Sequence, residues 1–546
     1  MVMLIDPVVG DKFFGRNEVL TLLVKRVDAL KGGYRQNVAI TGHRLTGKSS
    51  LLNHFLLNLK DNEIIPIYIE VLEEPFRQFA TKFIGTLLYN FLKYNQRETR
   101  DDLEYLLKCC ESDIPETVTS IKNILRQIEK GDNNESYSEL LNLSSLLKKE
   151  SRKPCVVILD EFHNLSRLGI KDPFKCFGKK IMTQKDTMYI VASSEVSAIK
   201  NILSEKLSLL FGNFEKITLS GFDCETSRAF LHKNLAAVKI GDDLLDFIIA
   251  FADGHPFYLD ALINKINEIM GNLHFRMLTI PLTAQTLEEL LFDARGTINQ
   301  FFTNLLQDVI DPKMDKCKET LIAIAHGLYK HAEIANWTGY SRKEVSAHVK
   351  ILMNRNLIYK SGNVYVFYDK VLRFWLVKVY HKRRTTLVDN ISEKSKNFRN
   401  NVTGIIQNFI NNSKLDITAR IKLLMESFNG EMIEIDSKLH RLAQFDRTEI
   451  LEDGAKKYIG GYLNGKVYLF YIAKEHVDEN NILEFMKYSM KYKPALGRRI
   501  LIYLKDIDIN AKIMAKEMKV WLWNLDAVNN IFDLFGKEKV VRVDKI

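Results

Sequence analysis

One short segment of this 546-residue chain determines the fold expected for its N-terminal part: Ile40-Thr41-Gly42-His43-Arg44-Leu45-Thr46-Gly47-Lys48-Ser49-Ser50. Gly42, four intervening residues and then Gly47-Lys48-Ser49 complete the pattern G-x4-G-K-[ST]. The glycines allow the loop to wrap an anion, and backbone N–H groups at the start of the next helix point at a phosphate. Lys48 would reach the β- and γ-phosphates, and the Ser49 hydroxyl would ligate Mg²⁺. The stretch therefore predicts a site for a nucleoside triphosphate.

The sequence on either side of the loop fits this prediction. Residues 37–40 read Asn-Val-Ala-Ile, which is typical of a short buried strand, and residues 50–59 have helical apolar spacing. Strand, loop and helix in this order is the arrangement that the motif requires. The alternative is a chance match on a glycine-containing loop.

A second predicted strand ends in two acids. Residues 155–161 read Cys-Val-Val-Ile-Leu-Asp-Glu, and a continuous apolar run of this kind is typical of a buried parallel strand. We expect this strand to neighbour the one before the loop, so that Asp160 helps to hold Mg²⁺ beside Ser49. Glu161 would then polarise the attacking water. The alternative is an acidic strand end that caps the next helix.

A third strand is predicted at 188–192 and is followed by Ser193 and Ser194. Small polar residues at that point suit a sensor that hydrogen-bonds the γ-phosphate or the water, and we assign this role to Ser194. Serine after a strand is also common turn chemistry, which is the alternative.

Several motifs in this order resemble those of archaeal-type ATPases of the STAND group, relatives of the AAA+ initiators. Residues 14–18 match the F-x-G-R-x-x-E box, except that the glutamate follows Arg16 by two residues rather than three. Residues 42–52 resemble the G-x-R-R-x-G-K-T-S-L-L loop, with Leu45 and Ser49 as substitutions. Residues 159–162 resemble the acidic strand end, and 254–259 resemble the G-x-P-x-Y-L start of a lid helix. The resemblance covers roughly residues 10–380.

The resemblance implies an ATPase that uses ATP and Mg²⁺. Residues 14–18 would line the adenine side, and Pro256 would set the lid helix against the nucleotide, although Gly-His-Pro can also precede an ordinary core helix. The implied catalytic residues are Lys48, Asp160, Glu161 and Ser194, and the implied metal ligands are Ser49 and Asp160. The implied nucleotide contacts are Phe14, Gly15, Arg16, Gly42, His43, Arg44, Leu45, Thr46, Gly47, Lys48, Ser49, Ser50 and Pro256.

Composition and charge are those of a globular protein with a basic surplus. The chain is 46% hydrophobic, and its 78 lysines and arginines against 68 acids give a net charge of +10. This surplus favours an anionic partner, above all nucleic acid, although a solvated lysine-rich surface is the alternative. The six scattered cysteines suggest neither zinc nor a C-x-x-C pair, so we expect reduced thiols in a cytoplasmic protein. Without a signal-peptide core in residues 1–14 or a run of ~20 apolar residues, no membrane association is expected.

The length predicts roughly three or four domains. Residues 1–222 fit an α/β core with a long helical insertion over roughly 95–150, in which the tract 129–136 is expected to be an exposed loop. Residues 223–295 carry amphipathic helical patterns and are the expected lid. The strands expected in the core are 37–41, 64–70, 155–160, 188–192 and 215–219.

Residues 296–385 are expected to form a winged helix. Two helices are predicted before Ser341, which forms a capping box with Glu344 at the start of a third helix ending near 356. Residues 357–368 are expected to form the hairpin wing. If the module binds DNA, the third helix enters the major groove, and the expected contacts are Arg342, Lys343, Lys350 and Lys360. Such modules also serve purely for packing, and the basic run 378–384 either grips phosphates or is a solvated linker.

The element order predicted within residues 386–546 resembles the restriction-endonuclease-like fold that is often appended to ATPases of this kind. Lys474 stands at the lysine position of the E-x-K motif, but Ile472 stands at the acid position. Glu426 and Asp453 are candidate remnants of the site. Because a metal needs converging carboxylates, we expect a degenerate domain kept for binding or packing, with an active nuclease as the alternative.

The sequence thus predicts an α/β protein with a P-loop NTPase core on a parallel sheet, a helical lid, a winged helix and a restriction-endonuclease-like domain. The expected function is ATP hydrolysis coupled to DNA binding or remodelling. The alternatives are a STAND-type switch that reports binding of a protein partner, and an ATP-gated nuclease. A homo-oligomer that assembles with nucleotide is a further expectation, and Arg16, Arg44, Arg228 and Arg295 are unranked candidates for an arginine finger.

Overall fold

The computed structural model describes residues 6–59, 61–206, 214–274, 276–309, 315–387, 390–454 and 456–542, with the backbone alone at 308 and 309. The chain divides near residue 221 into two compact units, called here the N-terminal and the C-terminal unit, and residues 255–257 belong to the first of them. The ends of the predicted first and last domains, 1–5 and 543–546, lie outside the described residues. Each unit is considered by itself.

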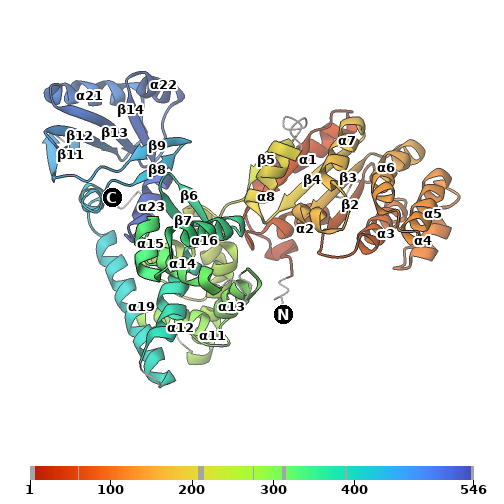
Figure 1. Ribbon diagram of the computed structural model, residues 1–546, viewed down its shortest axis with the longest axis horizontal. Helices are drawn as coiled ribbons and strands as arrows, with labels where there is room; N and C mark the ends of the chain where they lie inside the picture. Colours follow the sequence, from red (N-terminus) through yellow and green to blue (C-terminus); the bar gives the residue numbers. More distant parts are fainter. Residues whose placement is uncertain are drawn as a thin grey trace. The chain divides into compact units, whose positions relative to one another are not determined.

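A parallel sheet forms the centre of the N-terminal unit (Figure 1). Its described strands lie in the order β2-β3-β4-β1-β5. The order corrects one expectation, because β4 lies between the strand before the glycine loop and the strand that ends in Asp160. The two ends still meet, since the carboxyl ends of parallel strands share one edge of a sheet. The strands are β1 (Asn37–Thr41), β2 (Ile65–Glu70), β3 (Cys155–Asp160), β4 (Thr187–Ser193) and β5 (Phe214–Thr218).

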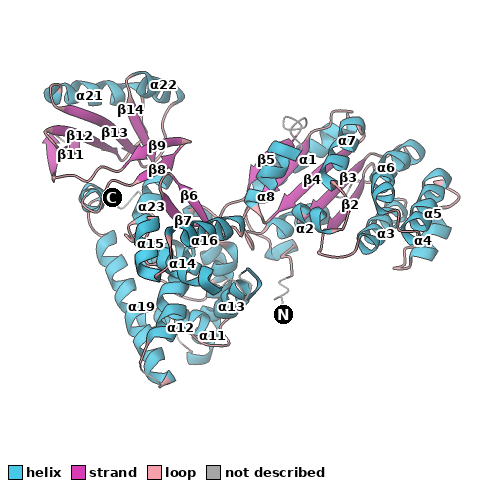
Figure 2. Ribbon diagram, in the orientation of Figure 1, coloured by secondary structure: helices cyan, strands magenta, loops and turns pink. Residues whose placement is uncertain are grey.

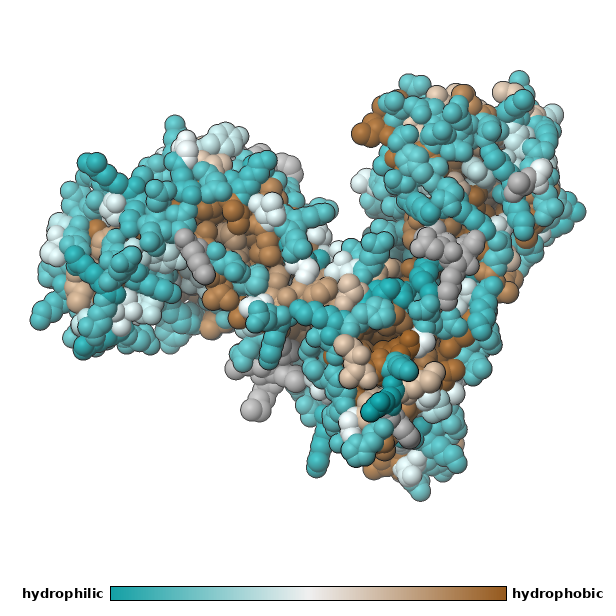
Figure 3. Space-filling model, turned by 180° about the vertical axis from the view of Figure 1, so that it is seen from behind, coloured by the Kyte–Doolittle hydropathy of each residue, from teal (hydrophilic) through white to brown (hydrophobic). Residues whose placement is uncertain are grey.

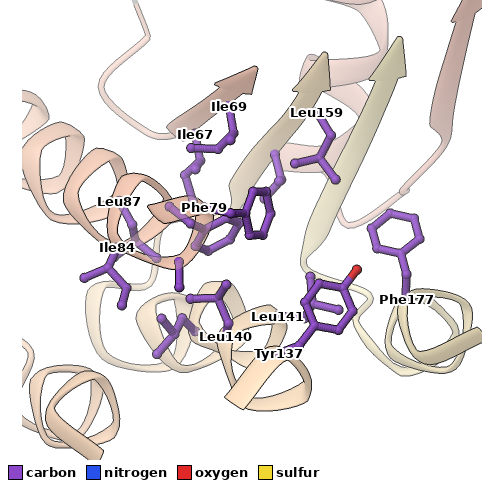
Figure 4. Close-up of a cluster of buried hydrophobic side chains, with 14 of the residues drawn as sticks. Ile67, Ile69, Phe79, Ile84, Leu87, Tyr137, Leu140, Leu141, Leu159 and Phe177 are labelled. Carbon is purple, nitrogen blue, oxygen red and sulfur yellow. The ribbon is translucent and has the colours of Figure 1, made fainter. Parts of the chain in front are cut away.

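Helices cover both faces of this sheet. On one face α1 and α2 pack through residues such as Leu23 and Leu51, and on the other face α3, α6 and α7 enclose a larger cluster. Figure 4 shows that cluster, in which Ile67 and Leu159 of the sheet point toward Phe79 and Leu140. The helices of this unit are α1 (Asn17–Lys31), α2 (Lys48–Asn58), α3 (Phe76–Tyr94), α4 (Leu103–Cys110), α5 (Pro115–Glu129), α6 (Asn133–Ser151), α7 (Pro173–Thr183) and α8 (Val196–Asn201).

The helical insertion, α4 to α6, belongs to the same core. Leu106, Ile121 and Leu140 are buried in one cluster with the sheet. The loop expected at 129–136 is shorter than predicted: residues 130–132 form an exposed turn, and α6 already begins at Asn133. Ser136 is buried, and its hydroxyl donates to the Asp132 carbonyl 2.8 Å away, so its polar group is satisfied inside the helix.

The C-terminal unit begins with a helical group. Its long helix α19 packs on α10 and α12, where the rings of Phe292 and Phe398 stack 5.3 Å apart and Ser395 and Arg399 bond to Glu288. The domain boundary predicted near 385 stays a prediction. The helices of this group are α9 (Cys224–Asn234), α10 (Asp242–Ala252), α11 (Pro256–Leu273), α12 (Ile280–Leu291), α13 (Thr297–Val309) and α19 (Ile391–Ser413).

Three helices and a hairpin follow the first part of this group. Ser341 and Glu344 form the capping box at the start of α16 that the sequence predicts. Val345 and Leu352 of α16 are buried against α14 and α15. The elements are α14 (Asp315–Ala325), α15 (His331–Thr338), α16 (Arg342–Asn354), β6 (Ile358–Ser361), β7 (Val364–Phe367), α17 (Lys370–Trp375) and α18 (Lys382–Thr385).

The last part of the chain is a sheet with helices on both faces (Figure 2). Its strands lie in the order β10-β11-β12-β13-β14, antiparallel from β10 to β12 and parallel from there on. α20 and α23 bury one face, and α21 and α22 bury the other. The elements are α20 (Ile417–Met425), β8 (Met432–Ile435), β9 (Lys438–Arg441), β10 (Arg447–Asp453), β11 (Lys456–Leu463), β12 (Lys466–Ala473), α21 (Glu479–Ser489), β13 (Leu496–Tyr503), α22 (Ile509–Glu517), β14 (Val520–Asn524) and α23 (Leu525–Leu534).

The segment 537–542 connects this sheet domain to α10. Lys539 pairs with Asp253 at the C-cap of α10, and Arg542 pairs with Asp242 and Asp246 on the helix itself. Both cationic side chains are largely buried, at 15% and 18% exposure. We call this segment the C-terminal strap.

Hydrophilic residues cover most of the face drawn in Figure 3. Among the helices that the structure describes, none is both long enough and apolar enough to cross a bilayer.

Candidate active site

The loop between β1 and α2 has the backbone geometry of an anion cradle. A Cβ at Gly42 would lie 2.5 Å from the carbonyl oxygen of Leu219, so only glycine fits there. Gly47, directly before α2, has φ 91°, a left-handed conformation that favours glycine. Leu45 adopts φ 60° without being glycine, which is a strained conformation of the kind found at ligand-binding loops.

The Lys48 side chain lies inside this loop. Its ammonium group donates to the carbonyl oxygens of Gly42 and His43, at 2.9 and 2.7 Å. Only 4% of the residue is exposed, and burial lowers the pKa of its ammonium group. The charges of Glu161 and Asp160 oppose this lowering, and a phosphate placed in the loop would add further negative charge beside the cation.

Asp160 lies at the carboxyl end of β3 within reach of α2. Its Oδ2 accepts a hydrogen bond of 2.6 Å from the Ser49 hydroxyl and one of 3.1 Å from Tyr68, and its Oδ1 accepts from the Glu161 amide. The residue is fully buried, and burial raises the pKa of its carboxyl group. A hydroxyl and a carboxylate this close are the hard oxygen donors that Mg²⁺ takes in proteins, so the residues fit that ion.

Glu161 is held at the end of β4. Its Oε2 accepts from the Ser194 amide at 3.0 Å and from the Ser194 hydroxyl at 2.8 Å, and it lies 3.4 Å from Nδ1 of His163. Glu161 itself has φ 50°, so the chain turns sharply after β3 and presents this carboxylate beside β4. In this arrangement the Ser194 hydroxyl donates its hydrogen bond to Glu161. The role of Ser194 as a phosphate sensor stays a prediction.

Sequence reasoning missed Tyr68 and His163. Tyr68 lies on β2, two residues before its end, where Glu70 is level with Asp160 in the register of β2 and β3. Because alternate residues of a strand share a face, Tyr68 is on the same face as Glu70, and that position was the available signal. His163 follows Glu161 by two residues, and a polar side chain so close to the acidic strand end was the signal for it.

The predicted adenine-side box lies at the start of α1. Gly15 and Arg16 both have positive φ, 70° and 64°, and the Arg16 guanidinium donates to the carbonyl oxygen of Ser220. The Ser50 hydroxyl, a predicted nucleotide contact, instead accepts from the amide of Val8 at 3.0 Å. The structure therefore brings Arg16 to the segment after β5, and it ties Ser50 to the N-terminal segment.

His43 and His255 add two imidazoles to the loop. Burial, together with the charge of Lys48, lowers the pKa of His43 to about 4, so this ring is neutral at pH 7. Nε2 of His255 lies 3.1 Å from the carbonyl oxygen of Arg44, directly before the predicted contact Pro256, with which α11 begins. Of the remaining predicted contacts, Phe14 directly precedes Gly15, and Thr46 lies in the loop, where its hydroxyl donates to the His43 carbonyl at 2.9 Å.

The residues that the sequence singles out in the last domain have separate partners in the structure. Ile472 is buried in the hydrophobic core, and the Lys474 ammonium group pairs with Asp416 at 3.0 Å. Glu426 and Asp453 are bound elsewhere, to Lys422 and Lys491. Within the described ranges, no three histidines, cysteines or acids are grouped to hold a metal ion.

Comparison with known proteins agrees with the geometry of the loop. Residues 13–262 match the family model described as "ATPase domain predominantly from Archaea". The match contains the glycine loop, the end of β3, the end of β4 and Pro256. No curated protein matches the chain.

Three solved structures match the chain at low identity. The Walker-type ATPase PABY2304 of Pyrococcus abyssi is 19% identical with a TM-score of 0.47, covering 68% of this chain and 98% of its own. The ORC2 protein of Aeropyrum pernix is 12% identical with a TM-score of 0.42, covering 73% and 96%. The ORC1 protein of Aeropyrum pernix, solved in complex with DNA, is 13% identical with a TM-score of 0.39, covering 69% and 96%. The assignment therefore rests on the family model that residues 13–262 match, and the chain is an ATPase.

Proposed function

We propose that this ATPase uses Mg²⁺ and couples its nucleotide state to DNA binding by α14–α16 with the β6–β7 hairpin, a module with the element order of a winged helix. The proposal of DNA binding is supported by the residues on the outer face of α16. Arg342, Lys343 and Lys350 are exposed on it, while Val345 and Val349 are buried. A helix with three exposed cationic side chains on one face is suited to enter a groove lined by phosphates.

The chemistry follows from the residues around the loop. Lys48 would leave its two carbonyl partners for the β- and γ-phosphates of ATP. Ser49 and Asp160 would hold Mg²⁺, which when bound neutralises phosphate charge. Glu161 would accept a hydrogen bond from the water that attacks the γ-phosphorus. The bond from that phosphorus to the β–γ bridging oxygen then breaks, which gives ADP and inorganic phosphate.

The hairpin turn has a different neighbour from the one that DNA binding by a wing would need. The Asn363 amide donates to the Met432 carbonyl at 3.0 Å, and the Met432 amide donates back to the Asn363 side chain at 2.8 Å. A Cβ at Gly362 would lie 2.1 Å from the same carbonyl. The turn is thus docked on β8, and we assign DNA contacts to α16 and to Lys360, which is exposed.

The docked turn also favours a second candidate. A hairpin that packs on the last domain, together with a nuclease-like position filled by Ile472, suits a STAND-type switch. In that case the ATPase cycle would report a protein partner, and the last domain, which we propose to be a degenerate restriction-endonuclease-like fold, would serve for packing.

DNA affinity as a function of salt separates the two candidates. For the wild type we expect log K to fall steeply with log[salt], because cations that meet phosphates release counterions. The triple substitution Arg342→Ala, Lys343→Ala, Lys350→Ala should reduce that slope by about 2–3, since each lost phosphate contact accounts for ~0.9. A matched triple of exposed lysines, Lys487→Ala, Lys512→Ala and Lys516→Ala, is the control. If neither triple variant changes the slope of log K against log[salt], or if no DNA binds, α16 is not the DNA contact. The STAND-type switch is then the remaining candidate.

A further inference from the structure

We infer that His163 is a positioning residue for Glu161, and this rests on the proposed role of Glu161 in orienting water. His163 lies in the 3₁₀ helix Phe162–Arg167 that directly follows β3. Only 8% of it is exposed. The imidazole is therefore fixed between the ends of β3 and β4, the two strands that supply the acids and the serines of the site.

The two ring nitrogens of His163 face different groups. Nδ1 lies 2.9 Å from the Ser193 hydroxyl and 3.4 Å from Oε2 of Glu161. Nε2 lies 3.5 Å from Oε1 of Glu195. The ring thus stands between two carboxylates that come from opposite sides, and it separates their like charges.

Arg167 is a second neighbour of Glu195. The guanidinium of Arg167 lies 3.8 Å from the same Glu195 oxygen and also pairs with Glu73. Oε1 of Glu195 therefore lies near both Arg167 and Nε2 of the His163 ring. The Nδ1 edge is consequently directed at Ser193 and Glu161.

The Glu161 carboxylate is bound through one oxygen only among the contacts described. Ser194 donates its amide and its hydroxyl to Oε2, and His163 approaches that same oxygen. Among the described contacts, Oε1 accepts no hydrogen bond. A carboxylate fixed at one oxygen has a defined direction for the other, which is the preorganisation that general-base chemistry requires.

A purely structural role for His163 would be packing of a buried ring. Packing and positioning make different predictions for two isosteric amides. The side-chain amide of asparagine occupies the place of Nδ1, and that of glutamine occupies the place of Nε2. Positioning of Glu161 depends on the Nδ1 side, so His163→Asn should rescue what His163→Ala loses, and His163→Gln should not.

The test is steady-state ATP hydrolysis by the full chain, with nucleotide affinity measured separately. We expect His163→Ala to lower kcat at least tenfold while the Kd for ATP stays within twofold of wild type. His163→Asn should recover most of kcat.

The outcomes are separable from those of the proposed function. If His163→Ala retains wild-type kcat while Glu161→Gln is inactive, the positioning role is wrong and the role of Glu161 stands. If Glu161→Gln retains turnover, the proposed function itself fails. If His163→Ala does not fold, the comparison of His163→Asn with His163→Gln tests the positioning role. A kcat several-fold higher for His163→Asn than for His163→Gln supports positioning, and equal values overturn it.

Discussion

The Ser49 hydroxyl donates a hydrogen bond of 2.6 Å to Oδ2 of Asp160, which joins two residues 111 positions apart in the chain. Ser49 lies in the first turn of α2, which follows β1, and Asp160 lies at the end of β3, with β4 between β1 and β3 in the sheet order. The bond therefore marks the point where the glycine loop and the acidic strand end converge. It is the geometric reason for placing Mg²⁺ and the phosphates of ATP there.

Replacing Lys48 by alanine should abolish nucleotide binding. The ammonium group is the one that would meet the β- and γ-phosphates, and the substitution removes the buried cation of the loop. Isothermal titration with ATP and Mg²⁺ is the measurement, and Lys25→Ala, an exposed lysine of α1, is the control. An unchanged Kd for Lys48→Ala would show that nucleotide binds elsewhere.

Tyr68→Phe should weaken binding of Mg·ATP without removing it. The substitution deletes one hydroxyl that donates to Asp160 at 3.1 Å, while the Ser49 hydroxyl still donates to the same oxygen. A hydrogen bond to a charged group contributes roughly 1.5–3 kcal/mol, and the remaining donor reduces the loss, so we expect about a three- to tenfold rise in Kd. Tyr34→Phe, at an exposed position, is the control. A Kd equal to wild type would mean that Tyr68 does not orient Asp160.

His43 should stay neutral down to about pH 5. Its ordinary pKa of 6.5 is lowered to about 4 by burial and by Lys48. Between these two values the unfolded chain binds more protons than the folded one, so this contribution to stability is complete above pH 6.5 and is lost as pH falls toward 4. The measurement is a ¹³C-histidine NMR titration, with the signal assigned by its loss in His43→Asn. A midpoint near 6.5 for that signal would contradict the buried environment.

Loss of the C-terminal strap contacts should destabilise the C-terminal unit. In Lys539→Ala with Arg542→Ala, the carboxylates of Asp246 and Asp253 each lose one cationic partner, although Arg228 and Lys370 remain beside them. An incompletely satisfied buried group costs about 1–3 kcal/mol.

Tryptophan fluorescence follows this change selectively, because all tryptophans of the sequence, at 337, 375, 521 and 523, belong to the C-terminal unit. We expect a lower Tm for the double variant and an unchanged one for Lys512→Ala with Lys516→Ala. Equal Tm values for both would mean that the strap contributes nothing to stability.

Elements that follow a strong local pattern could be predicted from the sequence, and those that depend on distant neighbours could not. The continuous apolar run before Asp160 and the capping box at Ser341 are local signals, and both elements lie where expected. Strand β10 was not predicted, since its residues are mostly exposed and charged and it pairs only along one edge with β11. Helix α19 was also missed, because its apolar residues, such as Phe398 and Ile406, are diluted by asparagines and lysines.

The candidate site divides in the same way. The motif residues Lys48, Ser49 and Asp160 could be predicted, because their spacing along the chain encodes their chemistry. Two features could not be predicted: the position of β4 between β1 and β3, and the contacts of Tyr68. Both arise only when separate strands are brought side by side. The docking of Gly362 on Met432 is likewise a contact between distant segments.

Steady-state ATP hydrolysis with and without duplex DNA tests the central claim most directly. The wild type should hydrolyse ATP faster when DNA is present, the Arg342→Ala, Lys343→Ala, Lys350→Ala variant should keep its basal rate but lose the stimulation, and Glu161→Gln should bind ATP without turning it over. A wild-type rate that DNA leaves unchanged would contradict coupling to DNA and would leave the chain as an ATPase switch for a protein partner.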